Sequence, residues 1–152
     1  MVDASMSGLP PFLTENSGLH SGFMMTQVTA AALVAENKNL AVPSSVDSIP
    51  TSANQEDHMS MATYAARRLL QMTDNLSDII AIEWMTAARG VEFHTPVGTS
   101  PSLTRAVARL REVVPPHEGD RFLADDIANA KTRLLAGDLR EICPTLTDSL
   151  RG

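Results

Sequence analysis

The longest apolar pattern in the sequence predicts one helix from residues 55–58 to about Arg89, a span of about 35 residues. Its apolar side chains recur every three or four positions and form two parallel stripes. One stripe holds Ala62, Ala65, Leu69, Met72, Leu76 and Ile79, and the other holds Ala66, Leu70, Ile80 and Trp84. At about 1.5 Å per residue the helix is roughly 50 Å long. Such a helix overhangs a 152-residue domain, so we expect a long-helix bundle or an interface.

Three shorter helices are predicted around the long one, over residues 21 to about 40, 101–114 and 124–136. Ser21 is a suitable N-cap for the first of them, and Gly90 is a natural C-terminal stop for the long helix. No segment shows the alternation that is typical of strands. The predicted fold class is therefore all-α.

The chain is expected to divide into three parts. Residues 1–20 read as an irregular lead-in, because two glycines and two prolines fall within them. Residues 21–93 carry the longer helices, joined by an extended connection over residues 42–58. Residues 94–152 form a smaller helical segment.

Charge and cysteine content exclude several classes of function. The chain has 12 Lys and Arg against 18 Asp and Glu, a net charge of −6, whereas nucleic-acid binding depends on clustered cations. A nucleic-acid partner is therefore not expected. The one cysteine, Cys143, cannot form an internal disulfide and fits a reducing compartment. Neither a signal peptide nor a membrane span is recognisable, so the expected location is the cytoplasm, with no membrane partner.

A polar cluster precedes the predicted long helix and consists of Gln55, Glu56, Asp57 and His58. Acidic residues at a helix start commonly offset the helix dipole and cap free N–H groups, which is one interpretation of Glu56 and Asp57. Adjacent helical residues point about 100° apart, so at most one of the two faces a substrate. His58 has no His or Cys partner at i+4, and no metal site is predicted.

Five sequence runs resemble the C-terminal part of histidine ammonia-lyase, a member of the aromatic amino acid ammonia-lyase and aminomutase family. They are residues 20–24 (HSGFM), 27–33 (QVTAAAL), 36–38 (ENK), 45–58 (SVDSIPTSANQEDH) and 65–69 (AARRL). The resemblance implies the C-terminal part of an oligomer built around a central bundle of very long helices. It also implies that residues 42–58 are an active-site connection and that each active site draws on more than one subunit.

The family's electrophile is 4-methylidene-imidazole-5-one (MIO), formed by cyclisation of an internal Ala-Ser-Gly. The three Ser-Gly pairs of this chain follow Met6, Asn16 and His20 instead, and the only tyrosine, Tyr64, lies in the long helix. The resemblance therefore implies a complementary chain, or a missing N-terminal part, that carries Ala-Ser-Gly and the tyrosine base. The expected assembly is a hetero- or homo-oligomer, and this chain is expected to be inactive alone. A natural split subunit and a truncated fragment both fit.

Two positions can be carried over from the family. Glu56 matches the glutamate that faces the substrate in histidine-type enzymes, which implies a catalytic and substrate-binding role. Met24 matches a wall of the active site, and Gln55 is expected to support Glu56 and help bind the substrate. Two positions depart from the family pattern, with His20 in place of an asparagine and Val42 in place of a histidine.

The expected function is non-oxidative elimination of ammonia from an amino acid, L-histidine to urocanate. An aminomutase outcome stays open, because such enzymes share the scaffold. The alternative is a catalytically silent structural or regulatory homologue that assembles with a lyase partner.

Overall fold

The structure is a computed structural model and describes residues 3–142, within which all regular elements are helical. This confirms the all-α class. Cys143 lies outside the described residues. In chain order the elements are α1 (Ala4–Ser7), the 3-10 helix η1 (Pro11–Leu13), α2 (Met24–Leu40), α3 (Ala62–Glu92), α4 (Pro101–Arg111), α5 (Ala124–Ala136) and α6 (Asp138–Ile142).

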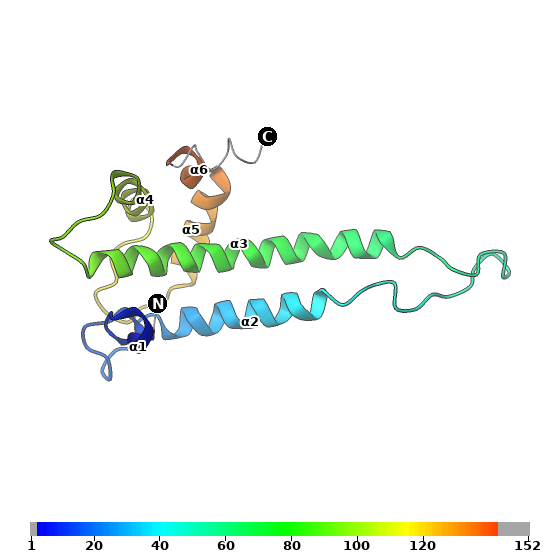
Figure 1. Cartoon of the computed structure of the whole chain (residues 1–152), viewed down its shortest axis with the longest axis horizontal. Helices are drawn as coiled ribbons and strands as arrows, with labels where there is room; N and C mark the ends of the chain where they lie inside the picture. The colour runs from blue at the N-terminus through cyan, green and yellow to red at the C-terminus, as the bar shows by residue number, and fades with distance from the viewer. Residues whose placement is uncertain (1–2, 143–152) are drawn as a thin grey trace.

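The long helix α3 is the axis of the molecule. It has 31 residues, which is about 46 Å of helix, and α2 runs antiparallel beside it (Figure 1). The buried core lies around the C-terminal half of α3, where the remaining helices gather. The core side chains are Ala81, Trp84, Met85 and Ala88 from α3, with Leu13, Phe23, Leu110, Val114 and Ala130 from other segments.

The other half of α3 and the end of α2 form a projecting two-helix arm that continues into the 41–61 loop (Figure 1). Asn37 ties the two helices together, because its amide donates to the Met72 carbonyl (3.1 Å) and its oxygen accepts from Asn75 (3.0 Å). Large apolar side chains nevertheless remain exposed along the arm, among them Val34, Val42, Val46, Ile49, Tyr64, Leu69, Leu70 and Leu76. The predicted excess of apolar surface is thus present in the isolated chain.

Several of the sequence-predicted helix boundaries are wrong. Helix α2 begins at Met24 rather than Ser21, whose backbone N–H donates to Asp120, and its N-cap Phe23 makes no side-chain hydrogen bond. Helix α3 continues through Gly90 to Glu92, because Gly90 is buried against the core and a helix continues where packing stabilises it.

The C-terminal helices follow the sequence more closely. Ser100 caps α4 by accepting the Leu103 N–H, and Gly137 ends α5 with a left-handed φ of 96°. Ion pairs attach α5 to the middle of α3, since the Lys131 ammonium lies 2.7 Å from Asp74 and 3.0 Å from Asp78. The three-part division of the chain stays a prediction.

Candidate functional site

The polar cluster Gln55–His58 lies in a loop at the far tip of the arm, not at a helix start. Helix α3 begins at Ala62, its N-cap Met61 makes no side-chain hydrogen bond, and its first turn holds no acidic residue. The capping interpretation of Glu56 and Asp57 is therefore wrong. The two residues are not in a helix, so the angle of about 100° between their side chains, from which we expected at most one to face a substrate, does not apply either.

The loop that presents Glu56 doubles back on itself. The Thr51 N–H donates to the Glu56 carbonyl (2.9 Å) and the Glu56 N–H donates to the Thr51 carbonyl (3.3 Å). Between them, Ser52, Ala53 and Asn54 all have left-handed φ values of 52°, 54° and 67°. Such backbone is costly for residues with a side chain. The backbone of this turn is therefore strained, and its two hydrogen bonds hold the backbone of Glu56 in place.

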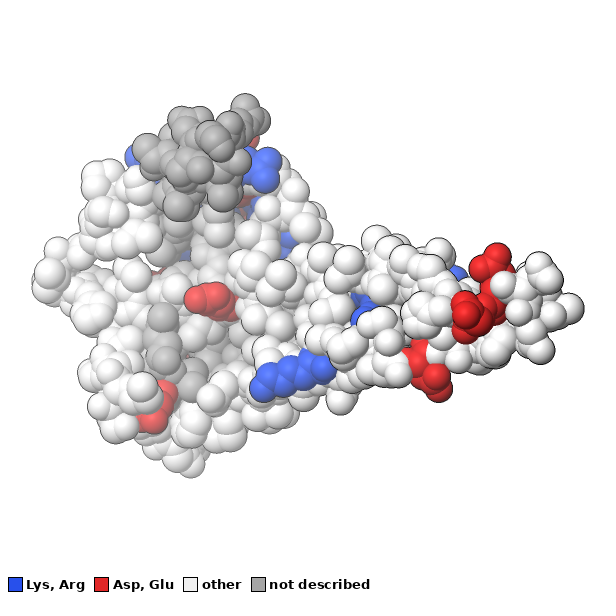
Figure 2. Space-filling view, turned by 45° about the vertical axis from the view of Figure 1, so that its right-hand side comes forward, with Lys and Arg blue, Asp and Glu red and all other residues white. Residues whose placement is uncertain are grey.

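The four side chains of the cluster are all exposed in this chain. Acidic side chains gather near the tip of the arm (Figure 2). Glu56, Asp57 and Asp47 are the exposed carboxylates of this region. The Glu56 carboxylate is exposed in this chain, so another chain can enclose it.

Met24 and Glu56 are not brought together within the chain. Met24 is half-buried at the first position of α2, whereas Glu56 lies beyond the opposite end of that helix. The 17 residues of α2 alone span about 25 Å. One pocket lined by both residues therefore requires more than one chain. Gln55 does lie beside Glu56, and its backbone N–H donates to Ser52 (3.1 Å).

No helix among residues 3–142 is long and apolar enough to cross a membrane. Within the same residues, no three His, Cys, Asp or Glu side chains gather as a metal site requires.

Comparison with known proteins places the whole arm and its loop in one family. The model of the aromatic amino acid lyase family matches residues 1–112, which is most of the chain. The chain belongs to the aromatic amino acid lyase family.

Several relatives in this family are histidine ammonia-lyases. That of Desulfotalea psychrophila is 58% identical over 137 residues, and that of Aromatoleum aromaticum is 53% identical over 151 residues. These alignments cover 90% and 99% of this chain but only 27% and 29% of the relatives. The chain thus spans under a third of the length of these lyases.

Solved structures of the family have the same fold. The histidine ammonia-lyase of Trypanosoma cruzi has a TM-score of 0.87 and 42% identity, covering 93% of this chain and 28% of that one. The tyrosine aminomutase of Streptomyces globisporus has a TM-score of 0.86 and 34% identity, covering 95% of this chain and 28% of that one. The long-helix fold expected from the sequence is therefore the fold of aromatic amino acid lyases.

A clamp beside Met24 was not predicted from the sequence. The Asp120 carboxylate accepts the backbone N–H groups of Ser21 (2.8 Å) and Gly22 (2.9 Å). These two bonds hold the pKa of Asp120 below its ordinary value. Asp120 is 99 residues from Ser21 and 98 residues from Gly22 in the chain. No sequence motif links the two segments. The clamp fixes the turn from which α2, and thus Met24, begins.

His117 lies buried next to this clamp. Its ring packs edge-on against Phe23 with centroids 5.1 Å apart, and neither ring nitrogen has a hydrogen-bond partner among the described residues. Burial lowers the pKa of His117, and the Arg121 and Arg89 guanidinium groups lower it further, against smaller opposing effects of Asp120 and Asp126. His117 is therefore held as the neutral imidazole.

We expect His117 to make stability fall in mild acid. Because its folded pKa is lowered, the unfolded state binds the proton more readily, and the free energy of unfolding decreases as pH falls below about 6.5. The slope contributed by one such histidine is at most about 1.4 kcal/mol per pH unit. Urea unfolding between pH 7.5 and 5 measures it. His117→Gln is expected to remove this part of the slope, whereas the exposed His94→Gln leaves it. An unchanged slope in His117→Gln would contradict the assignment.

Proposed function

We propose that the chain is the C-terminal part of a histidine-ammonia-lyase-like enzyme that eliminates ammonia from L-histidine to give urocanate. The observation that carries the proposal is identity of 53–58% to histidine ammonia-lyases over nearly the whole chain, which includes the run that holds Glu56. Phenylalanine-type enzymes have glutamine where this chain has Glu56, so the residue favours a histidine-type substrate.

Glu56 suits an imidazole substrate for a physical reason. A carboxylate enclosed in a dry pocket can accept the ring N–H, and this bond strengthens as positive charge develops on the ring. An apolar aromatic ring gains nothing from the same carboxylate. In the proposal Glu56 contacts the substrate, Gln55 supports it, and Met24 forms a wall.

The separation of Met24 from Glu56 supports a site shared between chains. Another chain that covers the arm would enclose Glu56 and bury the exposed Val46, Ile49, Leu69 and Leu70. Burial of apolar surface contributes about 25 cal/mol per Å², so the same contact drives assembly and builds the site. We propose a hetero- or homo-oligomer on this basis.

The electrophile of the family does not fit this chain. When present, MIO draws electrons from the bound amino acid so that ammonia can leave. Here no Ser-Gly pair follows an alanine, and two of the glycine nitrogens are already engaged. The Gly8 N–H donates to the Ala4 carbonyl (3.0 Å) and the Gly22 N–H donates to Asp120 (2.9 Å). We therefore assign MIO and the tyrosine base to a complementary chain or to an N-terminal part that is missing from this sequence.

Reconstitution tests the proposal. The purified chain alone is expected to show no deamination of L-histidine and no MIO absorbance. Mixed or co-expressed with a chain that carries Ala-Ser-Gly and the tyrosine base, it is expected to produce urocanate, followed by absorbance. Activity of the isolated chain would overturn the shared site. A stable but inactive complex would favour the silent homologue.

The silent homologue is the second candidate, and the exposed arm is the observation that favours it. The apolar side chains of the arm would be buried equally well in an oligomer without chemistry. The two candidates differ at Glu56, because only the enzyme needs its carboxylate.

A further inference from the structure

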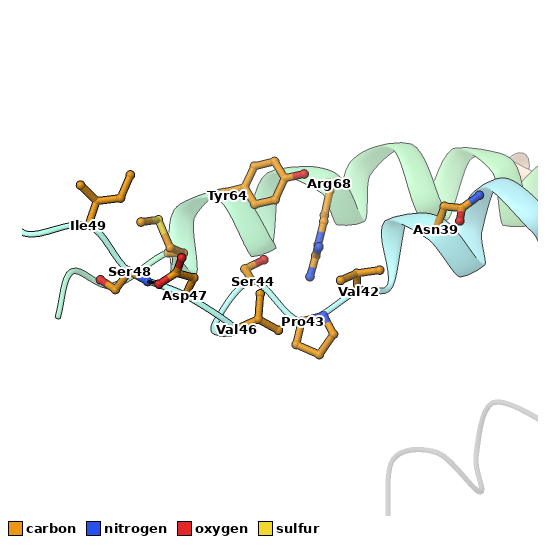
Figure 3. Close-up of a pocket in the computed structure, with 11 residues that line it drawn as sticks. Asn39, Val42, Pro43, Ser44, Val46, Asp47, Ser48, Ile49, Tyr64 and Arg68 are labelled. Carbon is orange, nitrogen blue, oxygen red and sulfur yellow. Dashed lines mark hydrogen bonds between the residues drawn. The ribbon is translucent and has the colours of Figure 1, made fainter.

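The two ends of α2 are fixed in different ways. At the C-terminal end, Val42, Val46 and Ile49 border an open cavity beside the first turns of α3 (Figure 3). In the proposed assembly another chain covers this face of the arm, so its final shape depends on a partner. At the N-terminal end, where Met24 lies, the contacts that fix the helix are made within this chain.

The turn that leads into α2 has three successive backbone N–H groups paired with other segments. Ser21 and Gly22 donate to Oδ2 and Oδ1 of Asp120 (2.8 and 2.9 Å). The next N–H, that of Phe23, goes to the Phe12 carbonyl (2.9 Å). Because each oxygen of Asp120 holds one N–H, the carboxylate fixes the orientation of the turn as well as its position. Helix α2 has no side-chain cap of its own, so its start is set by these contacts from outside the helix.

Asp120 is itself held in place through its neighbour Arg121. The Arg121 guanidinium donates to the carbonyls of Pro115 and Pro116 (2.9 and 3.0 Å). It also pairs with the buried Asp126 carboxylate in the first turn of α5 (2.8 Å). The planar fork of an arginine suits several acceptors at once, and here it joins the loop to α5. The Asp120 carboxylate is therefore presented by an anchored backbone.

Charge pairing does not explain Asp120. Within residues 3–142 it forms no ion pair, and its role there is to hold two backbone N–H groups. The Met24 N–H donates to the carbonyl of Ser21 (3.1 Å), so a displaced turn carries Met24 with it. Met24 is half-buried at the first position of α2, which leaves part of its side chain accessible. The carboxylate thus acts on the place of Met24 through the backbone.

We propose that Asp120 is a positioning residue for substrate binding, because it fixes the turn 21–23 and so sets where the Met24 side chain lies in the substrate pocket. The inference rests on the proposed function, in which Met24 forms a wall of that pocket. A wall contacts parts of the substrate that do not react. It therefore contributes equally to binding of the ground state and the transition state, and its displacement acts on KM rather than on kcat.

Steady-state kinetics of the reconstituted enzyme separate positioning from a purely structural role. Asp120→Asn keeps the size of the side chain but replaces one acceptor with a donor that faces a backbone N–H. KM for L-histidine is expected to rise about 5- to 50-fold, with kcat within about threefold of wild type, since displacing a group by about 1 Å can cost about 100-fold. A residue that only stabilised the fold would lower the active fraction, and thus the apparent kcat, at unchanged KM.

Two control variants lie near the clamp without touching the turn. Lys131→Gln breaks the ion pairs of α5 with Asp74 and Asp78, and Asp125→Asn removes an exposed carboxylate from the first turn of α5. Each is expected to change KM less than about twofold. If Asp120→Asn fails to fold, Asp120→Glu keeps both acceptors on a longer side chain and is expected to raise KM about 2- to 10-fold.

NMR of isotope-labelled methionine ε-methyl groups reports the geometry without a partner chain. The Met24 resonance is the one lost in Met24→Leu. In the full chain Asp120→Asn is expected to shift it and to leave that of the core residue Met85 unchanged. An inactive wild-type complex would overturn the proposed function and this role with it. With an active wild-type complex, an unchanged KM in Asp120→Asn or an unmoved Met24 resonance would overturn the role of Asp120 alone.

Discussion

Changing Glu56 to glutamine is expected to lower kcat/KM of the reconstituted enzyme for L-histidine roughly 10- to 150-fold. The substitution keeps the shape of the side chain and removes its negative charge. A neutral amide accepts a weaker hydrogen bond from the imidazole N–H, and it does not offset the positive charge that develops on the ring. Steady-state urocanate formation measures the change at saturating and limiting L-histidine.

Asp57→Asn is the matched control for this prediction. Asp57 is the next residue of the same exposed loop, so its substitution removes the same charge from nearly the same place. We expect a change of less than about twofold, because surface charges interact weakly across solvent. If Glu56→Gln left both the rate and the substrate preference unchanged, the catalytic role of Glu56 would be wrong.

Gly22→Ala is expected to lower the free energy of unfolding by about 2 to 5 kcal/mol. Gly22 has a φ of +53°, where a side chain is strained, and an added Cβ would lie 2.5 Å from the Phe12 carbonyl oxygen. That oxygen cannot move aside easily, since it accepts the Phe23 N–H (2.9 Å). The turn before Met24 must therefore shift and weaken its bonds to Asp120. Urea unfolding of the full chain measures the loss.

Gly8→Ala separates backbone strain from the steric clash. Gly8 has a similar φ of +68°, but an added Cβ there meets nothing within 4 Å. Its substitution is expected to cost about 1 to 2 kcal/mol, the strain alone. Equal losses at the two glycines would show that the contact with Phe12 carries no energy of its own.

The helices away from the arm loop were predicted well from the sequence. Residues 124–136 were predicted as a helix and form α5 with the same limits, ended by Gly137. The helix predicted over residues 101–114 begins at Pro101 as α4, although it ends at Arg111. These signals are local, because a capping residue, a proline or a glycine acts on the backbone within one turn.

The start of α3 was predicted too early, because polar residues before an apolar helix are equally typical of its first turn and of the loop that precedes it. Here the loop pairs Thr51 with Glu56 and passes through three left-handed residues, Ser52–Asn54. None of these is a glycine, and Asn54 is the one residue of the three that commonly adopts this conformation, so the sequence carries only a weak signal of the turn. The resemblance to the family singled out Glu56 and Met24 but contained nothing about His117 or Asp120.

By itself the sequence determined that a helix too long for one small domain runs through the chain, that its apolar stripes exceed what the chain can cover, and which family it resembles. Only the tertiary structure decided which half of α3 is buried, and that Met24 and Glu56 lie at opposite ends of α2. It also set the Asp120 carboxylate against the backbone N–H of Gly22. The physical reason is how far apart in the chain the interacting residues lie. Helix periodicity depends on neighbours within a few residues, whereas burial and clusters of side chains depend on contacts between segments far apart in the chain.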